Sequence, residues 1–116
     1  SEYFEEMSRI IMENNGTVDK YIGDSIMAFW GAPVADLHHA THACQSALLC
    51  QLKLAEVHRF WKRDQRPLFN TRIGIHTGEA VIGNIGSSER MNYTAIGDNV
   101  NLCSRLEGLN KYYGTN

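Results

Sequence analysis

The sequence lacks several features that would place it in a specialised class of protein. It has no apolar run long enough to cross a bilayer and no secretory signal at its start. It has no basic stripe, since 11 Lys and Arg and 13 Asp and Glu are spread along the chain, which argues against a nucleic acid polymer as partner. It has only three cysteines and no CxxC pair, which argues against a disulfide framework or a zinc knuckle. We therefore expect reduced thiols, a cytoplasmic setting and no direct membrane contact by this segment.

The composition that is present suits one soluble globular domain. The chain has 116 residues, of which 43% are hydrophobic and 21% charged, enough for one modest core and not for two domains. It opens within an amphipathic pattern and stops just after a helical one. Domain boundaries normally fall in polar linkers. We therefore expect this chain to be a piece of a larger unit.

Hydrophobic periodicity predicts a mixture of helices and strands. Apolar residues at helical spacing predict helices over 3–14, about 36–62 and from Asp98 onward, with Asp36 and Asp98 as caps. Runs rich in β-branched and aromatic residues predict five strands, over 17–22, 25–30, 71–76, 79–85 and 91–96. The last helix is expected to turn one apolar face to the core: Val100, Leu102, Cys103, Leu106 and Leu109. Hairpins mixed with crossover helices indicate an α+β fold, a ferredoxin-like sandwich of a mainly antiparallel sheet with helices.

The first candidate for chemistry is Asp24, in the run Lys20-Tyr21-Ile22-Gly23-Asp24. Gly23-Asp24 reads as a two-residue hairpin turn, because both residues tolerate positive φ. The turn would hold the Asp24 carboxylate clear of its neighbours, as a hard cation such as Mg²⁺ requires. Taken alone, the pair favours a simple turn former over a metal ligand.

The second candidate is the pair Asn101 and Arg105. They lie four residues apart and therefore share one face of the predicted helix. An amide and a guanidinium on one face can orient a sugar and neutralise charge on a phosphoryl group. The spacing alone favours a solvated helix face over a binding site.

Two other patterns are interpreted as structural. The glycines between Gly74 and Gly86 fit neither GxGxxG nor GxxxxGK[ST], so they indicate bulges or close backbone approach. His38 and His42 stand four apart but lack the HExxH glutamate and an evident third ligand. His76 is expected to be packed in a strand and not to be catalytic.

Taken together and in order, three stretches resemble the class III adenylyl/guanylyl cyclase catalytic domain. They are GTVDKYIGDSIMAFWGAP at 16–33, RIGIHTGEAVIGNIGS at 72–87 and MNYTAIGDNVNLCSRLE at 91–107. The resemblance covers nearly the whole chain and is strongest to bacterial members. It implies the cyclase fold and an enzyme that converts ATP to 3′,5′-cyclic AMP and pyrophosphate, with two Mg²⁺ or Mn²⁺ ions per site.

The resemblance also implies a role for each matching residue. Asp24 corresponds to the second of two metal-binding aspartates. Lys20 corresponds to the residue that reads the purine, and Thr94 to its partner on the facing hairpin. Asn101 corresponds to the residue that orients the ribose, and Arg105 to the one that stabilises the α-phosphate in the transition state. Such domains act as head-to-tail homodimers, so Asp24 would serve one site and Asn101 and Arg105 of the same chain the other.

Hydrogen bonding at the purine favours ATP over GTP. Adenine offers an acceptor at N1 and a donor at N6, which suit donation by Lys20 and acceptance by the Thr94 hydroxyl. Guanine presents donors at N1 and N2 and would require an acid where Lys20 stands. Threonine at position 94 resembles the subgroup that includes bicarbonate-responsive cyclases.

One departure from the family pattern affects the metal site. The family's first metal aspartate lies in an N-terminal strand within a motif of the FxDIxGFT kind, and the sequence contains no such motif. The C-terminal strands, with a phosphate-binding lysine, also have no counterpart. We interpret 1–116 as a partial cyclase catalytic domain that is incomplete for activity alone. The alternatives left open are a guanylate cyclase and a non-catalytic nucleotide-binding or dimerisation module that regulates.

Overall fold

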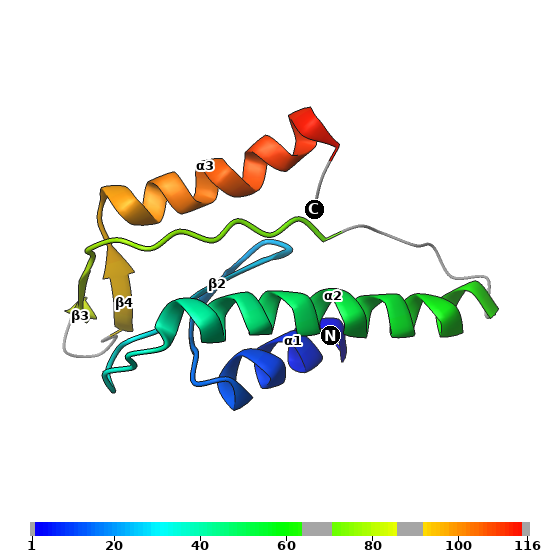
Figure 1. The fold of residues 1–116 in the computed structure, drawn as a ribbon, viewed down its shortest axis with the longest axis horizontal. Coiled ribbons are helices and arrows are strands. Elements are labelled where there is room, and N and C mark those ends of the chain that lie inside the picture. Colours follow the sequence, from blue (N-terminus) through cyan, green and yellow to red (C-terminus); the bar gives the residue numbers. More distant parts are fainter. Residues whose placement is uncertain (1, 64–70, 86–91, 115–116) are drawn as a thin grey trace.

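The computed structural model describes residues 2–63, 71–85 and 92–114. Three helices and four strands follow one another along the chain (Figure 1). Their order is α1 (Glu2–Glu13), β1 (Thr17–Ile22), β2 (Ser25–Phe29), α2 (His39–Arg63), β3 (Val81–Ile85), β4 (Asn92–Ile96) and α3 (Asp98–Tyr113). The α+β class predicted from the sequence is confirmed. Among the described helices, none combines the length and the apolar character needed to cross a membrane.

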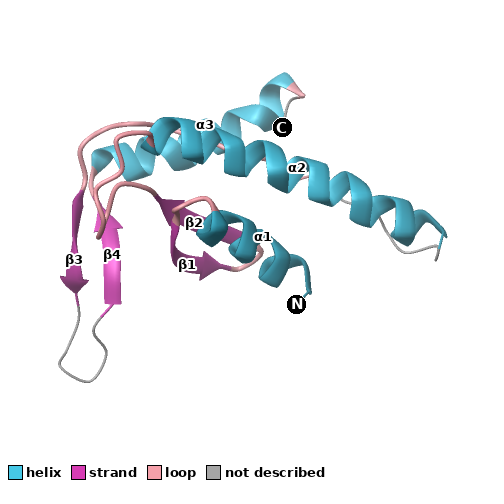
Figure 2. Cartoon of the chain, turned by 60° about the horizontal axis from the view of Figure 1, so that its bottom comes forward, coloured by secondary structure: helices cyan, strands magenta, loops and turns pink. Residues whose placement is uncertain are grey.

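The strands form two antiparallel hairpins. β1 pairs with β2, and β3 pairs with β4, each as a two-stranded sheet. Figure 2 shows them as separate pairs of strands. Gly23 and Asp24 connect β1 to β2, because Ile22 pairs directly with Ser25. Both hairpins agree with the predicted strands to within two residues.

The predicted strand over 71–76 is wrong. Residues 71–80 form no regular ladder in the described structure, and run extended between α2 and α3 (Figure 1). Side chains of the two helices bind the carbonyl groups that a neighbouring strand would otherwise take. The donors are Gln51 Nε2 to Thr71 O (2.8 Å), Asn110 Nδ2 to Ile73 O (3.1 Å) and Cys103 Sγ to Gly74 O (3.2 Å). The segment is thus held by helices and not by a sheet.

The core lies where α1 meets α2. Met7, Ile10 and Cys50 form a buried cluster, against which Tyr3, Ile26 and Ile73 pack. The amphipathic stripe predicted for the first helix therefore faces the core as expected. Burial raises the pKa of the Cys50 thiol to about 11, which keeps this sulfur protonated at neutral pH.

The third helix differs from its prediction in two ways. None of its described side chains is buried, and Leu102 and Leu109, expected in the core, are 36% and 43% exposed. Its N-cap is Gly97, without a side-chain capping bond, and Asp98 is the first helical residue. An acidic residue in the first turn still stabilises the helix through its dipole. The apolar positions of α3 are only partly covered by the residues of this chain.

Close backbone approach explains one glycine that the sequence analysis singled out. A Cβ on Gly74 would lie 2.4 Å from Glu107 N and 2.7 Å from Cys103 O, both backbone atoms of α3. Backbone atoms cannot rotate away as a side chain can, so any side chain at position 74 pushes the segment off the helix. Gly74 therefore permits the contact that seats residues 71–80 on α3.

We predict that Gly74→Ala lowers the free energy of unfolding by about 1–3 kcal/mol, the usual cost of overpacking. Gly108→Ala is the control, because a Cβ there meets no atom within 4 Å and alanine suits a helix interior better by about 1 kcal/mol. Chemical denaturation of both variants measures the difference. A Gly74→Ala protein as stable as the parent would contradict the close approach.

Candidate functional site

The β1–β2 hairpin carries Asp24 at its tip. Gly23 has φ of 58°, whereas Asp24 lies outside the left-handed region, so only the first turn residue takes positive φ. Asp24 is exposed and follows directly on the last strand pair, Ile22 and Ser25. The turn is as predicted in position, and it projects the carboxylate into solvent. A short, paired hairpin of this kind limits the freedom of its tip.

Lys20 lies further down the same hairpin. It pairs with Met27 and its side chain is exposed. The register shifts just before it: Val18 pairs with Ala28, and Asp19 is the additional residue between the two pairs. Such a bulge bends the strand and redirects its side chains. The bulge thus sets the direction in which Lys20 leaves the strand.

Thr94 lies on the second hairpin. Its Cα pairs with that of Gly83 across β3 and β4, and its side chain lies outside the described residues. A hydrogen bond nevertheless joins the two hairpins beside it. Ala95 N–H donates to Asp19 Oδ2 at 2.9 Å. The residues that precede Lys20 and follow Thr94 are thereby in direct contact.

Asn101 and Arg105 lie on α3, both exposed and about one turn apart. Within the described residues, neither side chain is hydrogen-bonded to Asp24, and the hairpin and the helix present their groups separately. A neighbouring amide secures the start of the helix. Asn99 accepts a hydrogen bond from His76 Nε2 (2.8 Å) and donates to Glu79 O (2.7 Å).

The contact between His76 and Asn99 corrects the expectation for this histidine. His76 is exposed and hydrogen-bonded, and it is not packed within a strand. The reason is that residues 71–80 form no strand, so alternate side chains are not turned into a core. Its ring is instead hydrogen-bonded to Asn99 and so joins the extended segment to the first turn of α3. Asn99 lies four residues before Cys103, which also contacts this segment.

His38 and His42 have the structural roles that the sequence suggested. The Asp36 carboxylate accepts the backbone N–H of His38 at 2.9 Å and contacts the ring of His42. The hydrogen bond to His42, with the backbone bond to His38, lowers the pKa of Asp36. Asp36 therefore lies before the first turn of α2, where it binds a free backbone donor as predicted for a cap.

Asp24 fits a divalent cation as one ligand. A carboxylate exposed at a turn offers the oxygen that Mg²⁺ or Mn²⁺ takes. Within the described part of the chain, no three His, Cys, Asp or Glu side chains gather into a metal-binding group. Mg²⁺ commonly binds one or two carboxylates and takes its other ligands from water and phosphate oxygens.

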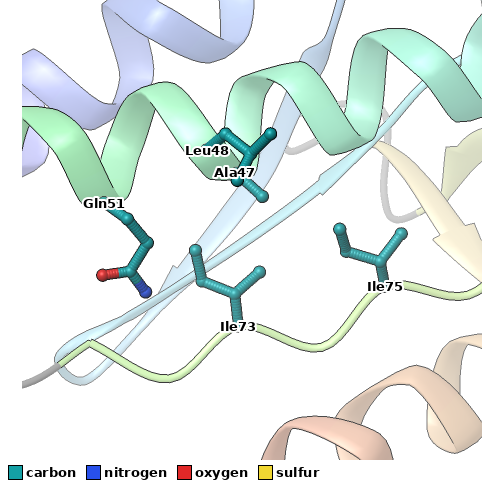
Figure 3. Close-up of a pocket in the computed structure, with 5 residues that line it drawn as sticks. All are labelled: Ala47, Leu48, Gln51, Ile73 and Ile75. Atoms are coloured by element: carbon teal, nitrogen blue, oxygen red, sulfur yellow. The ribbon is translucent and has the colours of Figure 1, made fainter. Parts of the chain in front are cut away.

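A shallow apolar pocket lies away from these residues. Figure 3 shows Ile73 and Ile75 pointing from the extended segment toward α2, from which Ala47, Leu48 and Gln51 face them. Four of the five side chains are apolar, and no predicted site residue lines the pocket. It offers no group for phosphate or metal chemistry. The polar candidates lie instead on the hairpin tip and on the exposed face of α3.

Comparison with known sequences decides the family. The sequence profile of the Adenylate and Guanylate cyclase catalytic domain matches residues 1–112. The chain belongs to this cyclase family. Adenylate cyclase 1 of Rhizobium meliloti (strain 1021) is 50% identical over 115 residues, and the adenylate cyclase of Anabaena cylindrica is 39% identical over 125 residues.

These curated relatives are much longer than the chain. The matches cover 99% and 100% of the chain but only 17% and 23% of the two relatives. Solved cyclases extend the likeness to the fold. The crystal structure of the guanylyl cyclase Cya2 has a TM-score of 0.86 at 37% identity, covering 92% of this chain and 54% of that one. The adenylyl cyclase CyaB from P. aeruginosa has a TM-score of 0.85 at 34% identity, covering 93% and 57%.

The TM-scores of Cya2 and CyaB, 0.86 and 0.85, differ little. One is named for guanylyl and the other for adenylyl cyclisation, yet the domain is about equally similar to both. Overall fold likeness therefore does not determine the base.

Proposed function

We propose that the enzyme to which this chain belongs is an adenylate cyclase, which converts ATP to 3′,5′-cyclic AMP and pyrophosphate. The observation that carries the proposal is the combination of an exposed Asp24 at a hairpin tip with an exposed Asn101–Arg105 pair on one helix face. Polar groups left in solvent on two rigid elements are suited to binding a charged ligand. The names of the relatives from Rhizobium meliloti and Anabaena cylindrica agree with ATP as substrate.

Lys20 and Thr94 would select the purine. The Lys20 ammonium carries donors only, so it suits the N1 acceptor of adenine and opposes the N1–H of guanine. The Thr94 hydroxyl can accept from the adenine N6 amine. The rejection of guanine would come mainly from an unpaired donor left facing a cation.

Arg105 and Asn101 would act at the phosphate and the sugar. In the reaction, the ribose 3′-hydroxyl gives up its proton to water and its oxygen forms a bond to the α-phosphorus, while the bond from the α-phosphorus to the β-phosphate oxygen breaks and pyrophosphate leaves. Negative charge grows on the α-phosphate oxygens, where a guanidinium can donate two parallel hydrogen bonds. Asn101, about one turn away on the same face, would hold the ribose so that the 3′-hydroxyl lies in line.

Asp24 would hold a divalent ion. Two such ions, when bound, supply a lowered pKa for the 3′-hydroxyl and positive charge for the leaving pyrophosphate. Asp24 contributes one carboxylate to this arrangement, with Mg²⁺ or Mn²⁺ as the ions whose ligand preference it matches.

We further propose that the site forms between two chains. Asp24 lies at the tip of the β1–β2 hairpin, whereas the Asn101–Arg105 pair lies on α3. Helix α3 also has no buried side chain, and Tyr112 and Tyr113 at its end are 87% and 76% exposed. A head-to-tail homodimer would cover this helix and bring the hairpin of one protomer to the helix of its partner.

Two alternative functions, a guanylate cyclase and a non-catalytic regulatory module, are less consistent with the residues present. A guanylate cyclase has support from the similarity to Cya2, but Lys20 opposes guanine. A regulatory module that binds nucleotide without catalysis does not need Asp24, Asn101 and Arg105 together. Both remain outcomes of the same experiment.

We expect the full-length enzyme to form cyclic AMP from ATP with Mn²⁺ or Mg²⁺, and to form cyclic GMP from GTP at least about 100-fold less efficiently, in line with hydrogen-bond selection. Product formation with each nucleotide, measured by chromatography, tests this. Preferential cyclisation of GTP would establish the guanylate cyclase. Tight nucleotide binding without any cyclic product would establish the regulatory module.

A further inference from the structure

We propose that Asp19 is a positioning residue for nucleotide selection, which fixes the hairpin carrying Lys20 against the hairpin carrying Thr94. This inference rests on the proposed function of those two residues. It depends on one hydrogen bond, from Ala95 N–H to Asp19 Oδ2 at 2.9 Å. Asp19 precedes Lys20 in β1, and Ala95 follows Thr94 in β4.

Within the part of the chain that the structure describes, no backbone ladder joins the two hairpins. β1 pairs with β2 and β3 with β4, as two separate two-stranded sheets. Strands β1 and β4 are nevertheless in contact. The Asp19 carboxylate therefore takes the place that a carbonyl group of a paired strand would have, and accepts the N–H that β4 directs toward β1.

The backbone of β1 is shaped for this contact. Asp19 is the residue that the register skips between the pairs Val18–Ala28 and Lys20–Met27. A bulged residue is released from the ladder, so its side chain can be turned away from the regular alternation. Aspartate is otherwise disfavoured in strands. A carboxylate at the bulge is accounted for by the donor that it reaches.

Loss of this hydrogen bond would be costly because its donor is buried. Ala95 is only 5% exposed, so water has little access to its backbone N–H. Removing the acceptor leaves a buried donor unsatisfied, which costs more than the bond itself contributes. Because the acceptor is charged, the bond is also stronger than a neutral one. The hairpins would otherwise shift until that N–H found another partner.

Such a shift has a specific consequence for the purine. Lys20 and Thr94 would each contact one edge group of the base, so their separation determines which base they accept. Displacement by about 1 Å at such a site can cost two orders of magnitude in efficiency. Asp19 touches no substrate atom in this proposal, and acts only through the spacing of its two neighbours.

The test compares kcat/KM for ATP and for GTP in the full-length enzyme. We expect D19A to lower the ATP:GTP ratio by about tenfold or more, mainly by raising KM for ATP. D19N keeps an oxygen that can accept the N–H, so we expect its ratio to stay within about twofold of the parent. A role in stability alone would lower both activities together and leave the ratio unchanged, which would overturn the proposal.

A matched control removes an equivalent bond elsewhere. Asp36 Oδ1 also accepts a backbone N–H at 2.9 Å, from His38 before helix α2. D36A is expected to lose stability without changing the ATP:GTP ratio. An equal drop in the ratio for D36A and D19A would show a general response to lost stability and would refute a specific role for Asp19.

A measurement on the unaltered enzyme keeps the proposal testable if D19A does not fold. Hydrogen–deuterium exchange of the Ala95 amide is expected to be slow, and exchange at the rate of an open amide would overturn the proposal. The same measurement separates the two proposals. If the parent enzyme cyclises neither nucleotide, the proposed function fails, and exchange at Ala95 still decides whether Asp19 joins the hairpins.

Discussion

Replacing Arg105 with alanine is expected to lower kcat of the full-length enzyme for ATP by about 10²–10³-fold, the usual loss when one donor to a developing charge is removed. We expect KM to change by no more than about threefold, because the guanidinium acts on charge that grows in the transition state. Arg105 is exposed on α3, so its removal leaves no cavity and should not unfold the domain. Steady-state kinetics with ATP, beside a thermal unfolding curve, measures both effects.

Arg59→Ala is the matched control for this prediction. Arg59 is also exposed on a helix, in the second half of α2. Its substitution removes the same side chain at a position far along the chain from the candidate site residues. It should leave kcat unchanged. An Arg105→Ala enzyme with near-normal kcat would remove Arg105 from the reaction, and a raised KM at constant kcat would make it a binding residue only.

Changing Lys20 to glutamate is expected to reverse the preference of the enzyme between ATP and GTP. The carboxylate removes the donor for adenine N1 and offers acceptors to guanine N1–H and the N2 amine. A site that depends on such bonds can discriminate by several orders of magnitude, so we expect the ATP:GTP ratio of kcat/KM to fall by about 100-fold or more. Competition between the two nucleotides in one reaction measures the ratio directly.

Lys111→Glu provides the control for the change of charge. Lys111 is exposed in the last turn of α3, and its reversal alters net charge by the same amount. If Lys111→Glu lowers the ratio as much as Lys20→Glu, the effect is electrostatic and general. If Lys20→Glu lowers activity with both nucleotides equally, Lys20 does not read the base.

Local patterns in the sequence were sufficient to predict the elements that form by themselves. The hairpin at Gly23-Asp24 follows from a turn pair between two β-branched runs, and its bounds agree with β1 and β2. The first helix and its apolar stripe are equally local. For the same reason, the positions of Asp24, Lys20, Asn101 and Arg105 on a turn, a strand and a helix could be expected.

Features that depend on distant partners could not be predicted in the same way. The apolar run at 71–76 has strand composition, but α2 and α3 bind its carbonyl groups through side chains. The apolar side of α3 was assigned to a core, yet none of its described residues is buried. Asp19 was missed because its donor, Ala95, lies 76 residues further on. The only local sign was an acid within a strand.

The close approach of Gly74 to the backbone of α3 limits how the helix can move relative to residues 71–80. At this point the two main chains touch, and the side chain of Asn99 bridges the same two elements a few residues away. A helix joined to its neighbour at both places cannot roll or slide alone. A rigid-body shift of α3 would therefore carry residues 71–80 with it, and a displacement of that segment would move the backbone from which Arg105 extends.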